Sequence, residues 1–237
     1  MIKTILIDFL GFLRRPNDEQ INLNFQNKLK YLFILLLFEI IFLLIIVLPL
    51  NLGIDKLTNI KESKFDYSDT LFHSVLLMVV IIPLFEELIF RYILRYQGFK
   101  TKFLKKTTWN YIFPFLVYGL SISFGLLHIS NYLNEDKLFL FLSPLIIISQ
   151  LFGGFIITFI RVRLNFVWGV FYHWVWNFLF VIFIPIIENQ FSKPFAEYTS
   201  NHNITISEQV FFNKEVKQTL KIDTSNTKLH KVKIKVQ

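Results

Sequence analysis

Long apolar runs separated by short polar connections make up the chain as far as Ile187. A helix that crosses a membrane needs about 20 mostly apolar residues, and five stretches meet this condition. They are residues 31–50, 70–90, 109–129, 138–160 and 165–187. The connections between them are too short for a separate soluble domain. The pattern therefore predicts an all-α, polytopic membrane protein with about five transmembrane helices.

The two ends of the chain differ from this apolar part. Residues 1–30 begin with apolar positions at helical spacing beside basic ones, which predicts a short N-terminal interfacial helix. Asp8 interrupts the apolar positions and no small-residue cleavage site follows, so a helix is favoured over a signal peptide. Residues 188–237 form a polar tail, and the alternation at 231–236 fits an edge strand or a disordered segment. We expect residues 31–187 to form one transmembrane domain between these ends.

Basic residues alternate in number between successive connections. Five precede the first span, three lie in residues 51–69, five from Arg95 to Lys106, one in residues 130–137, and two at Arg161 and Arg163. Because cytoplasmic loops carry an excess of Lys and Arg, this alternation places the N-terminus in the cytoplasm and the tail outside. The net charge of +8 then reflects the basic residues of the loops that face the cytoplasm.

Composition supports the lipid bilayer as the main partner. Hydrophobic residues make up 54% of the chain and charged residues 18%, against roughly 45–50% and 25% in soluble domains. Basic stretches interleaved with aromatic residues are few, so no nucleic-acid partner is expected. The chain has no Cys, which excludes disulfides, thiolate nucleophiles and Cys-based metal sites.

Charged residues inside the second span are the first candidates for chemistry. An ionisable residue costs roughly 2.5–3.5 kcal/mol at the centre of a span and by default marks a functional site. Glu87 and Arg91 are four residues apart, hence on one helix face and within reach of an ion pair. Glu86 is turned about 100° away. It is therefore free for chemistry while Glu87 supports the structure. The alternative is a charged helix end that reaches the interface.

Two further spans carry polar residues at helical spacing. Phe124 and His128 share a face at the end of the third span, and His173 and Asn177 share a face of the fifth. Glu86, helped by His128, can take a proton from water, and His173 and Asn177 can donate hydrogen bonds to an oxyanion. Alternatively, a zinc ion bound by Glu86, His128 and His173 activates the water. The sequence leaves both mechanisms open.

Three motifs appear in a fixed order: Glu-Glu-x-x-x-Arg, Phe-x-x-x-His and His-x-x-x-Asn, at Glu86 to Arg91, Phe124 to His128 and His173 to Asn177. In this order they resemble the CAAX prenyl protease and bacteriocin-processing family of intramembrane endopeptidases. The resemblance covers residues 70–187, which we therefore expect to form a protease-like core.

The resemblance implies that the protein hydrolyses peptide bonds in membrane-associated proteins or peptides. It implies catalytic roles at the water and the oxyanion for Glu86, His128, His173 and Asn177, with Glu87 and Arg91 in support. Metal dependence is disputed in the family, so a divalent metal such as zinc is an open expectation. The expected location is the cytoplasmic membrane of a bacterium. The prenylated substrate does not transfer with the motifs.

Two other classes of function fit some of the same residues. Some bacterial members of the family act as immunity or scaffold proteins, so a non-catalytic binding role is one alternative. An ion-coupled transporter with the intramembrane Glu and His residues as a proton relay is less favoured, because the five spans contain no inverted repeat.

Simple geometry does not bring the candidate residues together. If every span is a straight helix, Glu86 lies about 6 Å and His173 about 12 Å from the cytoplasmic face, whereas His128 lies near the opposite face. Glu39, the one charge in the first span, also lies about 12 Å from the cytoplasmic face. It either lines the same cavity or has a polar partner and no catalytic part.

Overall fold

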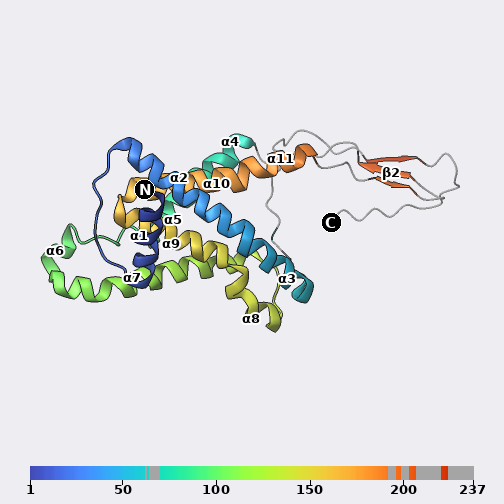
Figure 1. Cartoon of the computed structure of the whole chain (residues 1–237). Helices are drawn as coiled ribbons and strands as arrows, with labels where there is room; N and C mark the ends of the chain where they lie inside the picture. The colour runs from blue at the N-terminus through green and yellow to red at the C-terminus, as the bar shows by residue number, and fades with distance from the viewer. Residues whose placement is uncertain (62, 64–69, 192–195, 199–202, 207–219, 224–237) are drawn as a thin grey trace. The chain divides into compact units, whose positions relative to one another are not determined.

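The computed structural model describes residues 1–61, 63, 70–191, 196–198, 203–206 and 220–223. In this described part, five helical stretches are long and apolar enough to cross a membrane (Figure 1). They are Phe25–Thr58, Leu71–Phe90, Lys106–Asn131, Lys137–Arg163 and Phe166–Glu188. The predicted polytopic helical fold with five spans is confirmed.

Most spans consist of more than one helical segment. Before the first span lies α1 (Ile2–Arg14), and the first span is α2 (Phe25–Phe42), the π-helix η1 (Leu43–Val47) and α3 (Leu48–Thr58). The second is α4 (Leu71–Ser74), the π-helix η2 (Val75–Ile81) and α5 (Ile82–Phe90), followed by the short α6 (Phe99–Phe103). The third is α7 (Lys106–Leu127) with the 3₁₀ turn η3 (His128–Asn131). The fourth is α8 (Lys137–Ile146) and α9 (Ile148–Arg163). The fifth is α10 (Phe166–Asn177), the π-helix η4 (Phe178–Phe183) and α11 (Ile184–Phe191).

Each π-helical segment in the described chain ends two residues before a proline. Val47 precedes Pro49, Ile81 precedes Pro83, and Phe183 precedes Pro185 by this spacing. Proline lacks an N–H and its ring crowds the carbonyl one turn earlier, and a wider π turn relieves that crowding. The three helices therefore continue past their prolines, but with backbone carbonyls that need other donors.

The first span is longer than the predicted range 31–50. Its helix continues to Thr58, although Asn51, Asp55 and Lys56 make this end polar. Asn59 ends the helix in the left-handed conformation, with φ of 51°, which Asn tolerates better than most residues. Hydropathy therefore placed this boundary too early, because the helix outlasts its apolar run.

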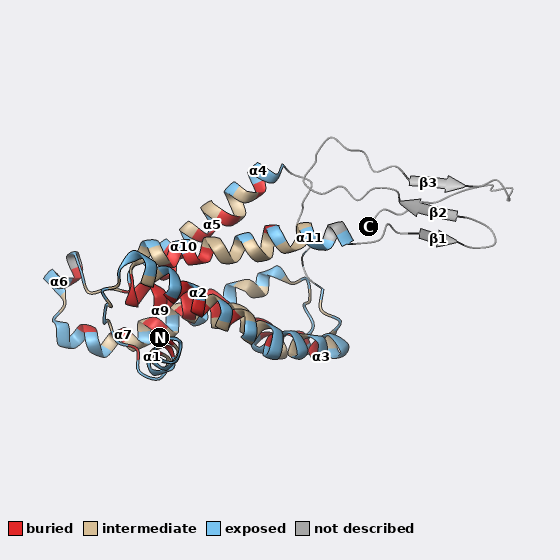
Figure 2. Cartoon of the chain, turned by 45° about the horizontal axis from the view of Figure 1, so that its top comes forward, coloured by how far each residue is buried: buried red, intermediate tan, exposed pale blue. Residues whose placement is uncertain are grey.

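The helix α9 lies at the centre of the helical bundle. Its residues from Ile156 to Arg163 are all buried (Figure 2). The predicted N-terminal helix is present as α1, and it packs into the same core. Phe9 and Phe12 are buried, and their rings lie 5.3 Å from the ring of Phe159 in α9. Protein, rather than lipid, therefore covers much of the apolar face of α1.

The chain divides into two compact units. The first is Met1–Phe65 with Met78–Asn177, and the second is Asp66–Leu77 with Phe178–Gln237. The second unit contains a small antiparallel sheet of β1 (Ala196–Tyr198), β2 (Asn203–Ile206) and β3 (Leu220–Asp223) in the order β1-β2-β3. Part of the polar tail thus forms strands. The alternating positions 231–236 lie outside the described residues.

A polar network joins the ends of α5 and α9, and Asp18 connects it to the segment that follows α1. Arg161 of α9 donates to the carbonyl oxygens of Arg91 and Tyr92, at 3.0 and 3.1 Å. In return, Arg95 donates to the carbonyl oxygen of Val162 in α9. The last carbonyls of a helix have no partner within it. Each of these two helices therefore has its end capped by an arginine from the other segment.

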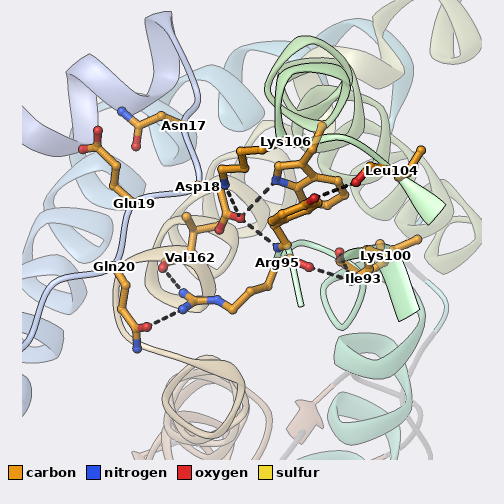
Figure 3. Close-up of polar contacts among 12 residues, drawn as sticks. Asn17, Asp18, Glu19, Gln20, Ile93, Arg95, Lys100, Leu104, Lys106 and Val162 are labelled. Carbon is orange, nitrogen blue, oxygen red and sulfur yellow. Dashed lines mark hydrogen bonds and ion pairs between the residues drawn. The ribbon is translucent and has the colours of Figure 1, made fainter. Parts of the chain in front are cut away.

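Asp18 lies at the centre of this network (Figure 3). Its carboxylate accepts hydrogen bonds from the Tyr96 backbone N–H at 2.8 Å and the Trp109 indole at 3.0 Å, and it pairs with Lys106 at 3.6 Å. Burial lowers the pKa of the Arg95 guanidinium, and the carboxylate of Asp18 opposes that shift. The N-terminal segment therefore fixes the residues that directly follow α5.

Substitution of Asp18 by Ala is expected to destabilise the protein through this network. The Asp18 side chain is 6% exposed, and its loss leaves two donors without an acceptor, at about 1–3 kcal/mol for each buried one. Thermal unfolding in detergent measures the effect. Glu19→Ala removes the same charge from an exposed neighbour and serves as the control. Equal unfolding temperatures for the two variants would contradict the central place of Asp18.

Candidate active site

Glu87, Arg91 and His173 form a buried polar chain between α5 and α10. Arg91 Nη1 donates to Glu87 Oε1 at 3.1 Å, and both side chains are fully buried. His173 Nδ1 donates to the same oxygen at 3.0 Å. Burial lowers the pKa of the Arg91 guanidinium, and the carboxylates of Glu87 and Glu86 oppose this shift. The predicted Glu87–Arg91 ion pair is present, and its carboxylate also orients the histidine.

Glu86 faces the other nitrogen of the same histidine. Its Oε2 lies 3.5 Å from His173 Nε2, and its side chain is 27% exposed. The neighbouring glutamates thus differ in environment, as their 100° separation on the helix requires. Glu87 is enclosed and has partners. Glu86 is partly exposed.

The ring of Phe124 links His128 to the buried polar chain of Glu87, Arg91 and His173. The Phe124 ring lies 4.8 Å from the ring of His128, 5.9 Å from that of His173, and 3.8 Å from the guanidinium carbon of Arg91. His128 Nδ1 donates to the Phe124 carbonyl oxygen at 2.8 Å. Since a carbonyl oxygen accepts and never donates, Nδ1 carries the proton. His128 Nε2 is therefore the basic nitrogen.

The third span explains why straight helices misplaced His128. It is 26 residues long, about 39 Å at 1.5 Å per residue, against an apolar core of about 30 Å. Its early residue Trp109 bonds Asp18 in the polar network. The start of α7 therefore lies beside this network, and Phe124 near its other end contacts the ring of His173.

Asn177 and Trp174 donate to backbone carbonyls in the turn before Pro83. Asn177 Nδ2 donates to the Met78 carbonyl oxygen at 2.8 Å, and Trp174 Nε1 donates to that of Val80 at 3.1 Å. Both carbonyls lie in the π-helical turn before Pro83, where the missing N–H of the proline removes one backbone donor. These two hydrogen bonds hold α10 against the second span.

One glycine lets the surrounding helices approach these residues. A Cβ at Gly154 would lie 2.9 Å from Phe124 Cδ1 and 3.3 Å from Arg91 Nη2. Small residues commonly serve such close contacts between membrane helices. Glycine at this position of α9 therefore leaves room for Phe124 and Arg91. A Cβ at Gly169 of α10 would lie 3.7 Å from Glu87 Oε2, which is an ordinary contact.

The set of three residues that we considered as zinc ligands does not form a metal site here. Among the described residues, no group of three or more His, Asp or Glu side chains is arranged to hold a metal ion. Both ring nitrogens of His173 already face carboxylates, at 3.0 and 3.5 Å. The donor set does not fit a bound metal in this arrangement, so no reaction step is derived through one.

The geometry can now be set against known proteins. Residues 68–179 match the family described as type II CAAX prenyl endopeptidase Rce1-like. Residues 68–179 are an Rce1-like domain. All six predicted site residues lie within this domain, which has the fold of a CAAX-type intramembrane protease. α1, α2 and α3 lie outside it. Searches for related curated proteins and for related solved structures found no match to this chain.

Sequence reasoning missed several residues that support the Rce1-like site. Phe124 entered as a motif position, but its contacts with Arg91 and both histidines came from the structure. Trp174 is the neighbour of His173 in the third motif, and its indole donates to a backbone carbonyl. The signal for this role was Pro83, because a proline inside a span removes a backbone donor and leaves a carbonyl that needs another one.

Proposed function

We propose that the protein is an intramembrane endopeptidase that hydrolyses peptide bonds of membrane-associated proteins or peptides. The observation that carries the proposal is the chain of contacts from Arg91 through Glu87 to His173 and Glu86. Through these contacts, the partly exposed carboxylate of Glu86 lies beside His173, and the hydrogen bond to Glu87 fixes the orientation of the His173 ring. A hydrolase of this kind needs a base that water reaches and donors that stay in place.

In the proposed reaction, Glu86 takes a proton from a water molecule, with His128 Nε2 as a second acceptor for that water. The water oxygen bonds to the carbonyl carbon of the substrate, and the electron pair of the C=O bond moves to its oxygen. The second N–H of Asn177 and, with His173 in its imidazolium form, the Nε2–H of His173 donate hydrogen bonds to this oxyanion. The C–N bond then breaks, and Glu86 returns the proton to the leaving amine.

The proposal extends to the setting of the reaction. The five spans make this an integral membrane protein. We place it in the cytoplasmic membrane of a bacterium with its N-terminus in the cytoplasm, as the positions of Lys and Arg favour. Glu86 lies near the end of α5 that leads into the basic residues from Arg95 to Lys106. The scissile bond is then near the cytoplasmic side.

Cleavage of a membrane-anchored peptide by the purified protein in vesicles tests the function. We expect products at one or few positions by mass spectrometry, and a loss of about 10²-fold or more in His173→Ala, as for removal of an oxyanion donor. His73→Ala changes an exposed histidine outside this site and is expected to retain activity.

Each outcome of this assay decides one part of the proposal. Absence of cleavage by the wild type would favour a non-catalytic binding protein. Equal activity of His173→Ala and the wild type would remove His173 from the mechanism. A chelator arm tests zinc: activity lost with chelator and restored by zinc supports a metal-assisted mechanism, and unchanged activity supports the side chains alone.

A further inference from the structure

Glu39 is a buried carboxyl group in the first span with no part in the proposed reaction. It lies in α2, outside the Rce1-like domain, and is 4% exposed. A carboxyl group placed among apolar helices needs a polar partner. Its partner is Tyr172, whose hydroxyl donates to Glu39 Oε2 at 2.5 Å. Tyr172 directly precedes His173 in α10.

Space for this carboxyl group is provided by α9. A Cβ at Gly153 would lie 2.4 Å from Glu39 Oε1, so glycine at this position leaves room for the carboxylate where it lies. At the next position, the Gly154 carbonyl oxygen faces Arg91 Nη2 at 3.5 Å. Two adjacent residues of α9 thus contact Glu39 on one side and the Glu87–Arg91 pair on the other. Glu39 is therefore packed into the same framework as the site.

The contacts of α10 indicate that the Glu39–Tyr172 hydrogen bond limits the rotation of this helix. The second span holds α10 at His173, Trp174 and Asn177. Glu39 supplies a hydrogen bond from the first span, and it acts one residue before His173. The separation of His173 Nε2 and Glu86 Oε2 is 3.5 Å, already longer than the 2.7–3.2 Å of an ordinary N–H···O hydrogen bond. A small rotation of α10 would therefore break this contact.

We infer that Glu39 is a positioning residue for His173, acting through the hydroxyl of Tyr172. The bond prevents α10 from turning about its axis and keeps His173 Nε2 directed at Glu86 and the substrate. This inference rests on the proposed function, since it assigns Glu39 a part in the same reaction. It also gives the first span, which lies outside the Rce1-like domain, a direct role in the site.

Tyr172→Phe tests the inference with a matched control. The change removes one hydroxyl, and we expect kcat to fall between about 10-fold and 100-fold with KM little changed, because misplacement by about 1 Å costs up to about 10²-fold. Tyr31→Phe removes the hydroxyl of another buried tyrosine, for which the described chain shows no hydrogen-bond partner. This control is expected to keep the kcat of the wild type.

Variants of Glu39 complete the test. Glu39→Gln retains an oxygen that accepts from Tyr172 and is expected to keep most of the activity, whereas Glu39→Leu is expected to match Tyr172→Phe. The double variant Glu39→Leu with Tyr172→Phe should lose no more than either single variant, because both remove one interaction. Rates are taken per folded molecule, with thermal unfolding measured on each sample.

A spectroscopic measurement separates this inference from the proposed function. The ¹⁵N resonances of the His173 imidazole, assigned by comparison with His173→Gln, should shift in Tyr172→Phe and stay unchanged in Tyr31→Phe. If the wild type cleaves nothing, the proposed function fails and these resonances alone decide the positioning role. A Tyr172→Phe variant with wild-type kcat, or with unchanged His173 resonances where no cleavage occurs, would overturn the inference.

Discussion

Substitution of Glu86 by Gln is expected to lower the rate of peptide cleavage by about 10³-fold while leaving the unfolding temperature close to that of the wild type. Glutamine keeps the shape of the side chain but cannot take a proton from water, and a general base contributes about 10²–10⁴-fold. Stability should change little, because the Glu86 side chain is 27% exposed and its closest ionic partner is 3.5 Å away.

Glu87→Gln is the matched control for this prediction. It makes the same chemical change at the adjacent residue. The Glu87 side chain, however, is fully buried and binds Arg91 and His173. We expect Glu87→Gln to lower both the unfolding temperature and the activity. Single-turnover cleavage with excess protein compares the chemical step in the two variants. If Glu86→Gln turns over at the wild-type rate, Glu86 is not the base.

The largest loss of stability is expected from Arg91→Leu. This substitution leaves the carboxylate of Glu87 buried without its cation, and removal of one partner of a buried ion pair costs about 3–5 kcal/mol. Glu87 Oε2 has no hydrogen-bond partner among the residues that the structure describes. Loss of the Arg91 donor therefore leaves the Glu87 carboxylate with the His173 hydrogen bond at Oε1. Urea unfolding in mild detergent measures the free energy.

The double variant Glu87→Leu with Arg91→Leu tests the reason for this loss. Replacement of both members of a buried pair by apolar residues is often neutral or stabilising, so the double variant should be more stable than Arg91→Leu alone. Activity should be absent in the double variant, because His173 Nδ1 has lost the carboxylate of Glu87 as its acceptor. Additive losses of stability in the double variant would show that the buried charge is not the cause.

The sequence was sufficient for the parts of the structure that depend on local periodicity. Hydropathy predicted the five spans, because a helix that crosses a membrane needs about 20 mostly apolar residues. The spacing of Glu87 and Arg91 predicted their ion pair, because residues four apart meet on one helix. The three motifs predicted which residues belong together, but not how far apart they lie.

The missed features depend on contacts between distant segments. The position of His128 depends on the contacts of Phe124 with His173 and Arg91, which hydropathy does not record. The pairing of Glu39 with Tyr172 depends on the space left by Gly153. Sequence offered two readings of Glu39, and its partner in α10 was visible only after the helices were packed.

The π-helical segments have a mechanical consequence for the site. One of them, η2, precedes Pro83 in the second span. A helix bends most easily where its ladder of hydrogen bonds is already interrupted. Trp174 and Asn177 of α10 donate to the Val80 and Met78 carbonyl oxygens of this turn. The second span and the helix that carries His173 are therefore tied together at the point where the second span bends most easily.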